Sequence, residues 1–136
     1  MGRVLAIDYG GVRTGMARSD ELQISVNPLP TIATNQLDEK LKYFLDKGEI
    51  TDVVFGYPVH KDGSPTQIGV KVEKLKSQYS KKYPKINFHL IDESFTSVKA
   101  KEMMLFLGTK KKKRRDKGSV DQMSAVLILK DFLDRI

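Results

Sequence analysis

The sequence predicts an α/β domain in which a mixed five-stranded sheet carries helices on both faces. Two observations carry this prediction. Three short strand-like runs follow one another closely in residues 4–32, as in an antiparallel meander. Two later apolar runs are each preceded by a segment with helical periodicity, which indicates parallel strands joined by helical crossovers.

The first three strands are predicted at residues 4–7, 14–19 and 24–32. The first is an unbroken apolar run, typical of a central strand that is covered on both faces. Pro28 and Pro30 interrupt the third run, and a proline cannot donate a hydrogen bond to a neighbouring strand. We therefore expect the third strand at an edge of the sheet.

Helical spacing of apolar residues predicts four helices. Gly48 ends the first, Pro84 blocks the second and Gly108 ends the third, while the last runs from about Ser119 to the C-terminus. Strands at residues 53–55 and 88–91 follow the first and second helices. The apolar positions of the four helices are Leu37, Leu41, Phe44 and Leu45; Ile68, Val72, Leu75 and Tyr79; Ala100, Met103, Met104 and Leu107; and Ala125, Ile128, Leu129 and Phe132.

Composition limits the classes of protein that the chain can belong to. Its 136 residues predict one domain, residues 1–136, and its net charge of +7 points to a polyanionic partner. The absence of cysteine excludes disulfides, thiolate zinc sites and a cysteine nucleophile. No apolar stretch reaches membrane-spanning length, and the opening MGRVLAID lacks a signal-peptide pattern. We expect a soluble, cytoplasmic protein without a membrane partner.

Acidic residues occur at three informative places. Asp8 ends the first apolar run, the pair Asp92 and Glu93 ends the last one, and Asp121 opens the final helix. Acids at the ends of adjacent elements can converge on one point, and converged carboxylates hold Mg²⁺ or Mn²⁺ against phosphate. Together with the positive charge, this pattern predicts a metal-dependent enzyme that acts on nucleic-acid phosphodiesters.

Each acid also has a purely structural interpretation. Asp8 could start a glycine-rich hairpin turn. Asp92 and Glu93 point to opposite faces if the strand stays regular, and both could instead precede a helix start. Asp121 could stabilise the dipole of the last helix behind a Ser119 cap. Its helical face is shared with apolar residues, however, so we expect it to point toward the sheet.

A basic run lies directly before the last helix. This concentration of like charge predicts a mobile loop that becomes ordered on a polyanion, although such runs are usually just solvated. Its position before Asp121 favours contact with a substrate near a metal. The run consists of Lys110, Lys111, Lys112, Lys113, Arg114 and Arg115, with Lys117 after it.

Four blocks resemble the YqgF family, the pre-16S rRNA nucleases or Holliday-junction-resolvase-like proteins. They are DYGGVRTGMARSD from Asp8, GYP then DGS from Gly56, DESFTSVKA from Asp92 and KGSVDQMSA from Lys117. The resemblance covers essentially the whole chain and implies a ribonuclease H-like fold. Ser94 stands where the family usually has Arg, and Ser97 replaces a usual Thr. These departures leave the acids intact and bear on rate and substrate preference.

The resemblance implies an acidic triad of Asp8, Glu93 and Asp121 that binds Mg²⁺ or Mn²⁺, with Gly10 and Arg13 in the first motif contacting nucleic acid. It further implies processing of the 5′ end of the 16S rRNA precursor. Holliday junction resolution on four-way DNA stays open, although it ordinarily needs a symmetric dimer. We expect a monomer or a weak homodimer.

Two other classes remain as alternatives. One is a non-catalytic nucleic-acid-binding accessory protein that keeps its acids for structural reasons. The other is an actin-like ATPase or sugar kinase, whose phosphate loop is similar to the segment after Asp8. Those proteins enclose nucleotide between two domains, and this chain has room for one.

Overall fold

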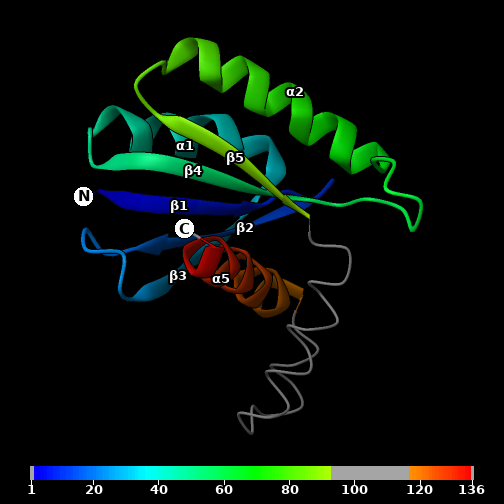
Figure 1. Cartoon of the computed structure of the whole chain (residues 1–136), viewed down its shortest axis with the longest axis horizontal. Coiled ribbons are helices and arrows are strands. Elements are labelled where there is room, and N and C mark those ends of the chain that lie inside the picture. Colours follow the sequence, from blue (N-terminus) through cyan, green and yellow to red (C-terminus); the bar gives the residue numbers. More distant parts are fainter. Residues whose placement is uncertain (1, 93–116, 136) are drawn as a thin grey trace, which may run out of the picture.

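A computed structural model describes residues 2–92 and 117–135, which form a mixed five-stranded sheet with helices on both faces (Figure 1). The predicted helix after Phe95 and the basic run of residues 110–115 lie outside the described residues. The strands are β1 (Arg3–Asp8), β2 (Arg13–Ser19), β3 (Val26–Ala33), β4 (Ile50–Tyr57) and β5 (Asn87–Asp92). The helical elements are η1 (Thr34–Gln36), α1 (Leu37–Asp46), α2 (Gln67–Lys82) and α5 (Lys117–Arg135).

The order of strands across the sheet is β3-β2-β1-β4-β5. β2 pairs antiparallel with both β1 and β3, whereas β4 pairs parallel with both β1 and β5. This arrangement confirms the predicted meander followed by parallel crossovers. β3, which contains Pro28 and Pro30, is an edge strand, as expected for a strand that cannot donate hydrogen bonds at those positions.

The sheet separates two apolar cores. Alternate residues of β1 point to opposite faces, so Leu5 and Ile7 pack with α1 and α2, whereas Val4 and Ala6 pack with α5 (Figure 1). All four side chains are fully buried, which explains the unbroken apolar run in the sequence. The α5 core includes Val4, Ala6, Ala17, Val54, Ile91, Ala125, Ile128, Leu129 and Phe132.

Helix α5 lies close to the sheet because β4 carries a glycine beneath it. A Cβ atom built on Gly56 would lie 2.5 Å from Cδ1 of Ile128, so only glycine leaves room for this isoleucine. One turn from the helix start, Nε2 of Gln122 donates to the carbonyl oxygen of Leu29 at 2.9 Å, which attaches α5 to β3. These contacts fix the helix in position over the central strands.

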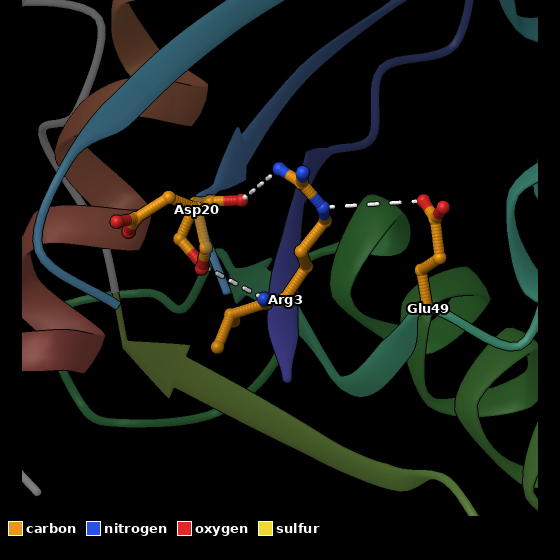
Figure 2. Close-up of polar contacts among 5 residues, drawn as sticks. Arg3, Asp20 and Glu49 are labelled. Atoms are coloured by element: carbon orange, nitrogen blue, oxygen red, sulfur yellow. Dashed lines mark hydrogen bonds and ion pairs between the residues drawn. The ribbon is translucent and has the colours of Figure 1, made fainter. Parts of the chain in front are cut away.

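The amino end of β1 is held by polar contacts, shown in Figure 2. Ser19 is fully buried, and its hydroxyl accepts from the amide of Val4 at 2.9 Å and donates to the carbonyl of Asp20 at 2.9 Å. Arg3 donates to the carbonyl of Ser19 at 3.2 Å and lies 3.9 Å from the carboxylate of Glu49. The register of β1 against β2 is thus fixed at the end opposite Asp8.

Several predicted boundaries differ from the structure, and β4 differs most, since it spans Ile50–Tyr57 rather than residues 53–55. The third strand begins at Val26 rather than residue 24, because Oδ1 of Asp20 accepts from the amides of Ile24 and Ser25 and holds them in the preceding turn. Helix α5 begins at Lys117 rather than near Ser119. None of the described helices has the length and apolar content needed to cross a bilayer.

Truncation of Ile128 should test how strongly α5 is held. Ile128→Ala should lower the free energy of unfolding by about 2–5 kcal/mol, because it removes a fully buried side chain and leaves a cavity above Gly56. Urea unfolding measures this change. The control is Lys130→Ala on the exposed side of the same helix, where we expect a change within about 0.5 kcal/mol. Similar losses for the two variants would contradict the packing described here.

Candidate active site

The carboxyl ends of three parallel strands lie side by side at one end of the sheet. β1 ends at Asp8, β4 ends at Tyr57 and β5 ends at Asp92, and these strands are neighbours in the order β1-β4-β5. The carboxyl ends of parallel strands are where α/β proteins commonly bind ligands. Asp8 and Asp92 therefore lie at the carboxyl ends of two of these strands.

Asp8 belongs to the sheet face that α5 covers. Val4 and Ala6 precede it at two-residue intervals and pack in the α5 core, and strand side chains alternate with a period of two. Its residue is half-buried, and across the sheet its Cα lies opposite that of Gly15 in β2. A carboxylate at this position lies at the border between the α5 core and solvent.

Asp92 lies on the other face. Its neighbour Ile91 packs in the α5 core, and Asp92 is exposed opposite Tyr57 of β4. The Tyr57 hydroxyl donates to the carboxylate of Glu73 in α2, and this bond raises the pKa of Tyr57 to about 12. By strand alternation, Asp8 and Asp92 therefore belong to opposite faces of the sheet.

The loop that follows Asp8 turns too tightly to carry a side chain at Gly10. A Cβ atom there would lie 2.4 Å from the backbone oxygen of Arg13. The Arg13 carbonyl occupies the space that a side chain at position 10 would need, so the turn itself requires glycine. Arg13 itself is exposed at the start of β2, at the same edge of the sheet.

Thr34, the first residue of η1, holds this loop in place. Its hydroxyl donates to the carbonyl of Gly10 at 2.6 Å, and its amide donates to the carbonyl of Val12 at 2.9 Å. The hydroxyl of Thr14, which is fully buried, lies 2.8 Å from that of Thr34. Because the single hydroxyl proton of Thr34 goes to Gly10, Thr14 is the donor in the second bond. One hydroxyl–carbonyl, one amide–carbonyl and one hydroxyl–hydroxyl bond therefore fix the backbone next to Asp8.

This role of Thr34 was missed by sequence reasoning. In the sequence, TIATN precedes a helix and resembles an ordinary helix start. Only the antiparallel pairing of β2 with β3, in which Arg13 lies opposite Ala33, brings Thr34 next to the glycine loop. The local pattern contains no sign of that pairing partner.

Asp121 lies in the second turn of α5, and its side chain is outside the described residues. Its backbone position precedes Ser124, Ala125 and Ile128 by three, four and seven residues, and all three are fully buried. Position 121 therefore continues the helix face that packs on the sheet. Because α5 runs antiparallel to β1, its first turns lie toward the carboxyl ends of the strands (Figure 1). Within the described part of the chain, Oγ of Ser124 on this face is buried and has no hydrogen-bond partner.

The remaining predicted site residues lie outside the described part of the chain. They are Glu93 and the basic residues 110–115, and of Lys117 only the backbone, in α5, is described. Among the described side chains no three acids or histidines form a group that could hold a metal ion. Glu93 and the side chain of Asp121 are outside that set, so the triad stays a prediction.

The model of the RuvX family, described as "Holliday junction resolvase", matches residues 2–135. The chain belongs to this family. RuvX is the YqgF family whose motifs the sequence contains, so the predicted membership is confirmed.

Curated relatives agree over nearly the full length. Proteins from Christiangramia forsetii and Flavobacterium psychrophilum are 39% and 38% identical to this chain, and each match covers at least 98% of both chains. A protein from Azobacteroides pseudotrichonymphae is 40% identical over 98% of this chain and 97% of its own. All three carry the name "Putative pre-16S rRNA nuclease". Together with the family, they confirm the predicted class of enzyme, a nuclease.

Solved structures confirm the fold. Thermus thermophilus RuvC in complex with a Holliday junction substrate superposes with a TM-score of 0.58 at 13% identity, covering 99% of this chain and 96% of RuvC. The Fowlpox virus resolvase in complex with Holliday junction DNA gives a TM-score of 0.54 at 10% identity and covers 97% of that resolvase. At such low identity the likeness concerns architecture, and it confirms the predicted ribonuclease H-like fold.

Removal of the Thr34 hydroxyl should loosen the loop beside Asp8. Thr34→Val keeps the shape but leaves the Gly10 carbonyl and the Thr14 hydroxyl without this partner, which should cost about 1–3 kcal/mol of unfolding free energy. Thr34→Ser keeps the hydroxyl and should cost less. Urea unfolding, together with hydrogen exchange of the amides of residues 10–14, measures both effects. Equal protection of those amides in the two variants would contradict this role of the Thr34 hydroxyl.

Proposed function

We propose that this chain is a metal-dependent nuclease of the cytoplasm that processes the 5′ end of the 16S rRNA precursor. Asp8, Glu93 and Asp121 bind one or two Mg²⁺ or Mn²⁺ ions, and residues 1–136 act as a single domain. The observation that carries the proposal is the position of Asp8, at the carboxyl end of the central strand and on the α5 face.

The choice of acids follows from the two faces of the sheet. Asp92 is on the face opposite Asp8, which favours the other acid of the pair, Glu93, as the partner of Asp8. Asp121 is favoured because its position continues the buried face of α5, where an isolated carboxylate would be costly. A divalent cation shared with other acids would offset that cost.

The chemistry of these residues fits a hard divalent cation. The three donors are carboxylates, the chain has no cysteine, and Mg²⁺ and Mn²⁺ prefer oxygen ligands. Once bound, the metal would activate water and stabilise charge on the phosphodiester. The protein residues supply the remaining functions. The Gly10 loop presents backbone close to the carboxylate, and Thr34 keeps that loop from moving.

Nucleic acid would be held by residues around this edge. Arg13 is exposed at the start of β2, next to the Gly10 loop, and can contact a phosphate. The basic residues 110–115 and Lys117 precede Asp121 in the sequence, so a phosphate held by them would lie near the start of α5. Binding through such contacts depends strongly on salt.

The precursor rRNA is favoured by the names of the curated relatives. A second candidate is four-way DNA, favoured by the family description and by two resolvases of the same fold in complex with Holliday junctions. Cutting two strands of a junction ordinarily requires two sites in a symmetric dimer. A monomer or weak homodimer that prefers RNA is therefore the form we propose.

Replacement of Asp8 should abolish cleavage without unfolding the protein. Asp8→Asn keeps the size of the side chain but removes a ligand charge, so cleavage in Mn²⁺ should fall on the order of 100-fold or more. Cleavage of precursor rRNA ends and of four-way DNA is compared with and without Mn²⁺, and circular dichroism monitors folding.

Asp134→Asn is the matched control, because it removes the same charge from an exposed position near the far end of α5. It should cleave like the wild type. Unchanged cleavage by Asp8→Asn would reject the proposed role of Asp8. If neither substrate is cleaved and titration with Mn²⁺ shows no saturable site, the chain would instead be a non-catalytic binding protein.

A further inference from the structure

Helix α2 carries a concentration of positive charge that the proposed active site does not use. Five lysines lie in its 16 residues, and Glu73 is its only acid. Glu73 is engaged by the Tyr57 hydroxyl. The neighbouring helix α1 differs, because its lysines are balanced by acids and Lys42 pairs with Asp38 at 3.4 Å. The lysines of α2 are Lys71, Lys74, Lys76, Lys81 and Lys82.

Helix stability alone does not account for this charge. Lys81 and Lys82 lie in the last turn, where cations stabilise the helix dipole. Lys71, Lys74 and Lys76 lie earlier, and within the described residues none of them forms an ion pair. Lys71 and Lys74 are three residues apart, a spacing at which like charges destabilise a helix. Repulsion of this kind is relieved when an anion binds.

A groove lies beside these lysines, between α2 and the edge strand β5. It has a volume of about 380 Å³ and is lined by Glu73, Lys76, Ser77, Ser80, Lys81 and Leu90. The groove offers two ammonium groups and two hydroxyls, beside the apolar side chain of Leu90 and the carboxylate of Glu73, which accepts from the Tyr57 hydroxyl. Ammonium and hydroxyl groups are the donors that proteins use for phosphate oxygens.

We propose that the α2–β5 groove binds the phosphodiester backbone of a nucleic-acid strand, at a distance from the position of cleavage. Lys76 and Lys81 are five residues apart, which corresponds to about 7.5 Å along the helix axis. Two ammonium groups at this separation can contact different phosphates of one strand. Ser77 and Ser80 lie between the two lysines in sequence and line the same groove.

One end of the groove lies near the carboxyl ends of the parallel strands, where Asp8 is located. Glu73 lines the groove and accepts from Tyr57, the last residue of β4, and β4 pairs with the strand that ends at Asp8. A substrate cleaved near Asp8 can therefore continue toward α2, and this part of the inference rests on the proposed function. Since contacts to phosphate carry no sequence information, the groove binds without sequence preference.

Binding without cleavage tests the inference directly. The double variant Lys76→Gln/Lys81→Gln should bind single-stranded RNA and DNA of one mixed sequence on the order of tenfold more weakly at about 0.1 M salt. The slope of log affinity against log salt should become shallower by roughly 1.4, or about 0.7 for each lost contact to a single strand. Fluorescence anisotropy in EDTA measures both quantities.

The matched control is Lys40→Gln/Lys47→Gln, which removes the same charge from α1 and the residue after it. It should lose little affinity. Equal losses in the two double variants would indicate a bulk charge effect and would overturn the inference, as would unchanged binding by the groove variant. Weaker binding of both polymers identifies their shared phosphodiester backbone, and weaker binding of RNA alone identifies the ribose backbone.

Because EDTA removes divalent metal, this assay does not depend on Asp8, Glu93 or Asp121. If Asp8→Asn cleaved normally while the groove variant bound weakly, the catalytic assignment would fail and the groove would stand. The opposite pair of results would reject the groove alone. Thermal unfolding of each double variant by circular dichroism shows whether the loss of affinity arises from the groove or from the fold.

Discussion

The packing of α5 across the central strands is the constraint on which the candidate site depends. Ile128 occupies the space that Gly56 leaves free on β4, and Gln122 attaches the start of the helix to β3. With these contacts made, position 121 lies about 10 Å along the helix axis from Ile128, toward the carboxyl ends of β1 and β4. A larger residue at position 56 would lift the helix and with it the acid that its first turns carry. Core packing and site assembly are therefore one problem in this chain.

The alternation of side chains along the strands places Asp8 and Asp92 on opposite faces of the sheet. Asp8 follows the residues that pack under α5, whereas Asp92 lies opposite Tyr57 on the other face. Asp92 lies on the face that α2 covers. Two lysines of α2 line the groove beside the edge strand β5. The sheet thus separates the proposed catalytic face from the groove proposed to bind the nucleic-acid strand beyond the cleavage position. The two surfaces meet at the carboxyl ends of β1 and β4.

Much of this architecture could be predicted from local patterns. The apolar run at residues 4–7 identified the central strand, Pro28 and Pro30 placed β3 at an edge, and helical spacing identified α1, α2 and α5. Long-range partners could not be predicted in this way. Thr34 contacts Gly10 across 24 residues, and Asp20 delays the start of β3 by bonding two amides in a turn. The α2–β5 groove likewise requires a helix and a strand whose contact no local pattern contains.

The central claim is that Asp8, Glu93 and Asp121 together form one binding site for divalent cations. The most direct test compares Asp92, the last residue of β5, with Glu93, the residue after it. Calorimetry measures the binding of Mn²⁺ to a variant of each. Glu93→Gln should abolish saturable binding, whereas Asp92→Asn, which removes the same charge from the opposite face, should bind Mn²⁺ like the wild type. Loss of binding in Asp92→Asn with binding retained in Glu93→Gln would contradict the account.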